Sequence, residues 1–166
     1  MSKIMNRAFA GALFAAAALS AGAANAAPVT ASATARANIL QQITVTNTSD
    51  LDFGTIVSGA AASTVAISTA GARTCGAGLT CTGTTTAANF NITGTNNAVV
   101  TITGDNSVTL SNGATTMTAS LVRSSAGGAL SATGTGSVTV GGTLSLAANQ
   151  ADGVYTGTFN VSVDYQ

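Results

Sequence analysis

Residues 107–121 have the sequence SVTLSNGATTMTASL, in which apolar and polar residues alternate on both sides of Asn112-Gly113. Successive side chains of a β-strand point to opposite faces, so this alternation indicates strands with one buried face. Asn-Gly is strongly preferred at the centre of a two-residue hairpin, because its backbone twist matches that of the strands. The stretch therefore predicts an antiparallel hairpin.

The same period of two recurs along most of the chain. It is found in residues 64–68, 89–93, 100–103 and 158–165. Two glycine-containing sites, Gly141-Gly142 and Gly104-Asp105-Asn106, predict two further turns between strands. No stretch after residue 26 has a helical period, and no fixed repeat of the kind that builds a β-helix is present. Short strands with turns between them predict an all-β, immunoglobulin-like antiparallel β-sandwich.

The first 26 residues have the pattern of a cleavable signal peptide. Lys3 and Arg7 precede an apolar run over residues 8–23, and Ala24-Asn25-Ala26 supplies the small residues of a cleavage site. A transmembrane anchor is the alternative, but the run is short and rich in alanine. We expect export through the inner membrane, with a mature chain that starts at Ala27 and has no integral membrane segment.

Charge is scarce in the expected mature chain. Three arginines and five aspartates give residues 27–166 a net charge of −2, and only 6% of the whole sequence is charged. A chain without a basic patch is a poor candidate for binding nucleic acid or anionic lipid. The low charge and the abundance of threonine, serine, valine and alanine favour a protein that packs against copies of itself.

The two cysteines, Cys75 and Cys81, enclose a glycine-containing loop. In an oxidising compartment such a pair predicts a disulfide, and closing so short a ring stabilises the protein by roughly 2 kcal/mol. The alternative is a redox or metal pair. Zinc sites need three or four ligands, and the chain has no histidine and no third thiol.

Groups that perform catalysis are almost absent. The chain has no histidine and no tryptophan, and after residue 26 it has no lysine and no glutamate, so a serine would have no activating base. Asp50 and Asp52 could contribute to a calcium site, but the six to eight oxygens that calcium requires are not nearby in sequence. We favour Asx-type turns before Phe53-Gly54. The expectation is a protein that is not an enzyme, with no catalytic residue, metal or cofactor.

An alternating apolar pattern also precedes the domain. The apolar positions of this extension are Val29, Ala31, Ala33, Ala35 and Ala37, and the same parity continues at Ile39, Ile43 and Val45. A single strand over 29–45 would be longer than usual, so we expect an extension followed by the first strand of the domain. An amphipathic strand without a place in its own sheet is suited to strand addition to a neighbour. The predicted organisation is a signal peptide over 1–26, an extension over 27–38 and a sandwich over 39–166.

The C-terminal region resembles the last strand of chaperone–usher pilins. It has a penultimate Tyr165, an alternating Phe159, Val161 and Val163, and a glycine fourteenth from the end, Gly153. Leu51-Asp52-Phe53-Gly54-Thr55 is similar to the Phe-Gly element of archaic pilins and spore-coat-U-like secreted domains. The order of features also resembles that of a domain-of-unknown-function family of secreted β proteins.

The resemblance implies an incomplete immunoglobulin-like sandwich that lacks one strand. A periplasmic chaperone would pair with the C-terminal strand, and export would follow through an outer-membrane usher to the cell surface. There the extension of another copy would replace the chaperone by donor-strand exchange. These expectations make the chain a shaft subunit of a fimbria that serves adhesion or biofilm formation.

The pattern leaves a second hypothesis open. Alternating residues such as Phe159, Val161 and Val163 form the core of any sandwich. The chain could therefore be a self-complete, monomeric secreted or surface binding module, for example for carbohydrate. Sugar sites usually present exposed aromatic rings, and this chain has only Tyr155 and Tyr165 besides its phenylalanines.

Overall fold

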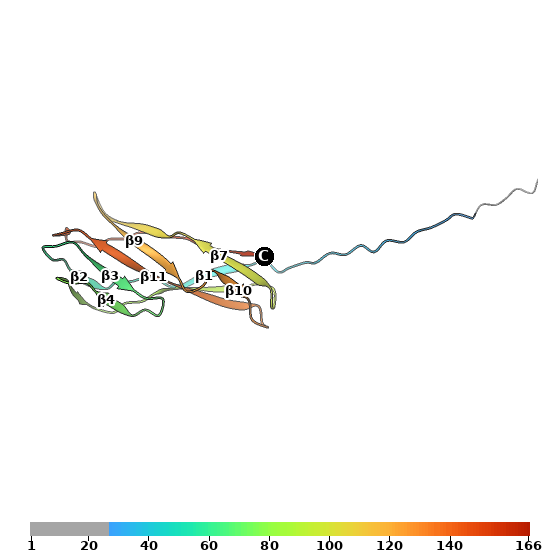
Figure 1. Ribbon diagram of the computed structural model, residues 1–166, viewed down its shortest axis with the longest axis horizontal. Helices are drawn as coiled ribbons and strands as arrows, with labels where there is room; N and C mark the ends of the chain where they lie inside the picture. Colours follow the sequence, from blue (N-terminus) through green and yellow to red (C-terminus); the bar gives the residue numbers. More distant parts are fainter. Residues whose placement is uncertain (1–26) are drawn as a thin grey trace, which may run out of the picture. The chain divides into compact units, whose positions relative to one another are not determined.

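The computed structural model describes residues 27–166 (Figure 1), so the predicted signal peptide lies outside the described residues. The chain divides into two units between Ala37 and Asn38. Residues 27–43 form no strand in the single chain, and residues 27–42 are exposed. The first strand of the domain begins at Thr44.

The described residues contain strands and no helix, which confirms the all-β prediction. The strands are β1 Thr44–Ser49, β2 Thr55–Val57, β3 Ser63–Ile67, β4 Arg73–Cys75, β5 Thr80–Thr82, β6 Ala88–Thr93, β7 Val99–Gly104, β8 Ser107–Asn112, β9 Thr115–Arg123, β10 Gly127–Ala129, β11 Thr135–Leu146 and β12 Val161–Tyr165. Residues 27–166 also hold no helix of the length and hydropathy that crossing a membrane requires.

Every paired strand is antiparallel to its partner. The larger sheet contains the order β1-β6-β11-β9, with β8 beyond β9, and β3 and β4 are added through β11. A second sheet has the order β10-β7-β12, and β2 and β5 form a separate ribbon. In their order across the larger sheet, β1, β6, β11 and β9 match strands A, B, E and D of an immunoglobulin domain, and β7 and β12 of the second sheet match C and F.

The sandwich buries two clusters of apolar side chains, one toward each end. The first core cluster consists of Ala88, Phe90, Ile92, Val100, Ile102, Leu130, Val138 and Val140. The second consists of Phe53, Val65, Ile67, Val108, Ala119, Leu144 and Leu146. Leu51, Leu121 and Phe159 pack against both clusters and join them. In Figure 1, β1, β7 and β10 lie at one end of the domain and β2, β3 and β4 at the other, with β11 between them.

The predicted hairpin is confirmed, but its two-residue loop is Gly113-Ala114, one residue later than the predicted Asn112-Gly113. Asn112 of β8 lies opposite Thr115 of β9, and Gly113 has a φ of 59°. A positive φ at the centre of a two-residue loop is the conformation that glycine adopts without steric cost.

The turn predicted at Gly141-Gly142 is wrong, because both glycines lie inside the 12-residue strand β11. A Cβ on Gly141 would lie 2.4 Å from the carbonyl oxygen of Ile67 in β3, and one on Gly142 would lie 2.9 Å from that of Ser120 in β9. These glycines allow three strands to approach closely, which is a second role of glycine in sheets.

The turn predicted at Gly104-Asp105-Asn106 is a bend where the chain changes sheets. β7 pairs with β10 and β12, whereas β8 pairs with β9, so the two strands form no hairpin. The segment before β12 follows the same bend: Asp105 N donates to Asn160 O at 3.0 Å, and Ser111 and Thr156 form an isolated bridge. The alternation over 158–165 therefore predicted a strand correctly only from Val161 onward.

Candidate functional site

The first and last strands of the sandwich are both edge strands. β1 pairs only with β6, and β12 pairs only with β7; within residues 27–166 no strand occupies the second edge of either. The apolar side chains beside these edges are half-buried against the first core cluster. They are Ile43 and Val45 on the first strand's side and Phe159, Val161, Val163 and Tyr165 on the last strand's side. We call this region the β1–β12 edge.

One end of the β1–β12 edge is closed by Tyr165. Its hydroxyl donates to the carbonyl oxygen of Gln41 at 2.7 Å and accepts a hydrogen bond from Thr95 N at 2.7 Å. Gly94 allows this contact, because a Cβ there would lie 2.6 Å from the Tyr165 hydroxyl oxygen. Tyr165 thus holds the end of β12 against the residues that lead into β1.

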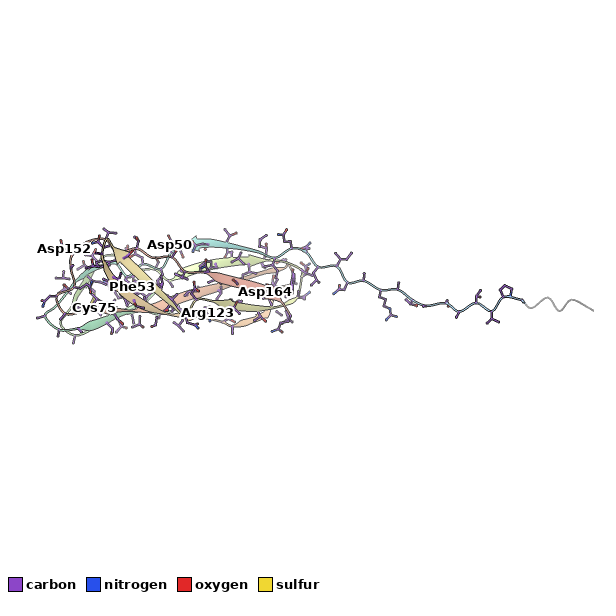
Figure 2. All side chains as sticks on the ribbon, turned by 90° about the horizontal axis from the view of Figure 1, so that it is seen from above. Asp50, Phe53, Cys75, Arg123, Asp152 and Asp164 are labelled. Carbon is purple, nitrogen blue, oxygen red and sulfur yellow. A yellow bond between two sulfur atoms is a disulfide. The ribbon has the colours of Figure 1, made fainter. Side chains whose placement is uncertain are left out.

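The other end of the β1–β12 edge opens into a cavity of about 650 Å³. Two segments form its mouth, residues 51–58 after β1 and residues 150–155 before β12, and Leu110, Met117, Leu144 and Leu146 form its floor. At the rim, Val57 is 59% exposed and Val154 is 80% exposed. Figure 2 shows the labelled Phe53, Cys75 and Asp152 toward this end of the domain and Asp164 toward the other.

The Phe-Gly element forms one wall of the cavity. Phe53 is buried in the second core cluster, and Gly54 has a φ of 74°. Asp52 Oδ1 accepts a hydrogen bond from Gly54 N at 2.7 Å, which is the Asx-type turn that the sequence predicted. A Cβ on Gly54 would lie 2.6 Å from Arg73 Nη1 and 2.7 Å from Thr82 O, so glycine is required by both conformation and space.

The Cys75–Cys81 disulfide is present and supports the same wall. Cys75 lies in β4 at the edge of the larger sheet, and Cys81 lies in β5 directly opposite Ile56 of β2. Ile56 lines the cavity. Because a two-stranded ribbon of three-residue strands is marginal by itself, the disulfide and the Arg73 hydrogen bond to Thr82 O (2.7 Å) attach it to the sandwich.

Gly153 belongs to the opposite wall. Its φ is 136°, and a Cβ would lie 1.8 Å from Asn112 Nδ2. The Asn112 amide also donates to Asp152 O at 3.2 Å. The 150–155 segment is therefore fixed against the β8–β9 hairpin, and Gln150 Nε2 donates to the Tyr155 hydroxyl at 2.9 Å within it.

The side chains of the extension remain exposed in the single chain. Val29 is 99% exposed, and the alanines at 31, 33, 35 and 37 belong to no strand. Ile39, which follows them with the same parity, is 89% exposed. Among residues 27–166, no group of three or more cysteine, aspartate, glutamate or histidine side chains is placed to hold a metal ion.

The sequence analysis found the edge strands but missed the cavity. Its mouth joins residues about 100 positions apart, and no local pattern in 150–155 indicates that Tyr155 lines the same cavity as Leu51 and Ile56. The Phe-Gly element was the one signal near it, since a buried aromatic before a left-handed glycine marks a tightly packed turn.

Residues 43–165 match the family model described as Domain of unknown function (DUF4402). The chain belongs to this family. The DUF4402 match extends from the residue before β1 to the last residue of β12, so it includes both edge strands and the cavity but not the extension. The comparisons found no matching curated protein and no matching solved structure.

Proposed function

We propose that this protein is a structural shaft subunit of a surface fimbria that polymerises by donor-strand exchange. The extension of one copy, residues 27–38, would add a strand along the β1–β12 edge of the next copy. The observation that carries the proposal is the pair of unpaired edge strands with half-buried apolar side chains between them. The extension offers the complementary pattern, an exposed segment of alternating apolar and polar residues that pairs with no strand within residues 27–166.

The energetics suit an extended backbone contact. A strand that pairs with β12 would satisfy main-chain N–H and C=O groups along its open edge. Each alanine side chain buries little apolar area. Its contribution is therefore close to the value for one buried CH₂ group, about 0.8 kcal/mol. The hydrogen-bond ladder would therefore provide most of the attraction along Val161 and Val163, which already pack on the first core cluster.

The export route follows from the same edge. A periplasmic chaperone would cover β12 through Phe159, Val161, Val163 and Tyr165 until an outer-membrane usher exchanges it for the next subunit. The protein would pass through the periplasm and reside at the cell surface, where the filament would serve adhesion or biofilm formation. In this role the protein is not an enzyme and needs no cofactor.

The cavity supports a second candidate function. A volume of about 650 Å³ with apolar walls and a few polar groups, among them Gln150 and Tyr155, lies in the range of small-molecule sites. A self-complete secreted binding module would use this cavity for its ligand and would remain monomeric.

A comparison of oligomeric states separates the two candidates. The chain from Ala27 to Gln166 is compared with a version that lacks residues 27–38, by size-exclusion chromatography and by SDS-resistant ladders. Ala33→Asp places a charge on the inward parity of the extension, and Thr34→Asp is its matched control on the outward parity. Ladders that are lost on truncation and with Ala33→Asp, but kept with Thr34→Asp, are the expected result. Equally soluble monomers throughout would contradict the fimbrial function and favour the binding module.

A further inference from the structure

We propose that Ile39 of one copy enters the cavity of the next and fixes the register of the donor strand. This inference rests on the proposed function, and it adds a residue outside the extension of residues 27–38. The cavity has room for a side chain much larger than an alanine methyl group, and the inward positions from 31 to 37 are all alanine. Ile39 is the next residue of the same parity, has a larger apolar side chain and is 89% exposed.

The direction of the donor strand follows from where the chain enters the domain. Gln41 lies against Tyr165, at the C-terminal end of β12, whereas the cavity lies beside residues 150–155 before β12. A donor parallel to β12 would bring its residue 39 to Tyr165, where the receiving chain's own Gln41 already lies. In an antiparallel donor, residue 39 instead lies at the cavity end of the β1–β12 edge. The donor's own domain then begins beyond that end.

The lengths of the two segments agree with this direction. Residues 29–39 and residues 155–165 are both eleven residues long. In the antiparallel register that places Ile39 opposite Tyr155, Val29 lies opposite Tyr165 and Ala33 opposite Val161. Directly opposed residues point to the same face of a sheet, and the odd-numbered side chains of 159–165 are the half-buried ones.

The register also determines which donor side chains lie opposite the residues of the receiving copy. The alanines at 31, 33 and 35 would lie opposite Val163, Val161 and Phe159, which already pack on the first core cluster. Ile39 would lie opposite Tyr155, among Leu51, Ile56 and Leu146 of the cavity wall. The small side chains thus lie opposite residues that are already half-buried along the β1–β12 edge, and the large side chain lies at the cavity.

Engineered cysteines in the full chain test the register directly. Ile39→Cys with Tyr155→Cys should give disulfide-linked ladders on non-reducing gels, because a residue 39 that enters the cavity would lie beside Tyr155 of its lining. Ala33→Cys with Val161→Cys should give the same ladders at a second point of the register. Leu40→Cys with Tyr155→Cys is the matched control, and should give none because residue 40 has the opposite parity.

The outcomes separate the register from the function. Polymers that link at other pairs, or at none of these, would overturn the register and leave the fimbrial proposal standing. If neither the variants nor the unaltered chain polymerise, both the register and the fimbrial proposal are contradicted. A small molecule bound in the cavity of the purified protein, detected by native mass spectrometry, would also overturn the role of Ile39.

Side-chain truncation gives an independent measurement. Ile39→Ala should increase the dissociation rate of polymers about thirtyfold or more, because the stabilisation from an isoleucine side chain buried in the cavity is lost. Leu40→Ala, which removes a neighbouring apolar side chain of the opposite parity, should change the rate by less than about threefold. Equal effects of the two substitutions would contradict the proposal.

Discussion

The two ends of the sandwich differ in how their core clusters are covered. At the end near Tyr165, the first core cluster is closed by a side chain whose hydroxyl makes two hydrogen bonds of 2.7 Å. At the other end, the second core cluster borders a cavity of about 650 Å³ with two exposed valines at its rim. The larger sheet runs through both ends, so the difference lies in what covers each core cluster: the Tyr165 side chain at one end and an open cavity at the other.

The comparison also separates two uses of local restraint. The closed end is fixed by packing and by Tyr165, whereas the walls of the cavity are fixed by a disulfide, an arginine and two left-handed glycines. A hollow lacks the contacts that hold a core together, so its walls need support from outside it. Substitutions at the two ends should therefore differ in size, and the following three measure that difference.

The largest effect is expected where the core is closed. Ile92→Ala, at a side chain that is almost fully buried in β6, should lower the free energy of unfolding by about 4 kcal/mol because it leaves a new void. Leu146→Ala, which only enlarges an existing cavity, should cost about 2 kcal/mol. Equilibrium urea unfolding of the monomeric fraction measures both. Equal costs would mean that the cavity end is packed as well as the closed end.

An intermediate effect is expected at the Phe-Gly element. Gly54→Ala should cost about 3 kcal/mol, because its φ of 74° is strained for alanine and its Cβ would meet Thr82 O. Gly113→Ala is the matched control: its φ is also positive, at 59°, but no atom lies within 4 Å of the added Cβ, so about 1 kcal/mol is expected. The difference between the two midpoints in urea isolates the steric part. A difference near zero would show that the wall yields easily.

The smallest effect on global stability is expected for the disulfide. Replacing Cys75 and Cys81 together by serine should lower the free energy of unfolding by roughly 2 kcal/mol, as expected for so short a ring. Hydrogen exchange should accelerate in β2 and β5 while β6 and β11 keep their protection, because the disulfide is the covalent link between this separate ribbon and β4 of the larger sheet. Uniform loss of protection across all strands would show that the disulfide holds the whole fold and not one wall.

The strands could be predicted because their evidence is local. Alternation over 89–93 and 107–121 produced the burial patterns of β6, β8 and β9, and Asn112-Gly113 produced the hairpin between them. The disulfide could also be predicted, because the sequence has only two cysteines and the loop between them is short. The alternating edge of the extension was visible for the same reason.

The errors arose where one residue type serves two purposes. Glycine pairs indicate turns, but Gly141 and Gly142 remain in a strand because carbonyl groups of β3 and β9 lie where their side chains would be. Gly104 similarly marks a bend that carries the chain from one sheet to the other. The cavity was hidden because it depends on how residues 51–58 and 150–155 meet, which no periodicity encodes.

The length of β11 has a mechanical consequence. Its 12 residues extend about 40 Å and are hydrogen-bonded in turn to β6, β3 and β9 (Figure 1). A pull directed along the strands loads such a ladder in shear, so that many perpendicular hydrogen bonds resist together and do not open one at a time. β1 would transmit load to β11 through β6, because β6 is hydrogen-bonded to both. The domain should therefore extend little under tension and then yield in a single step.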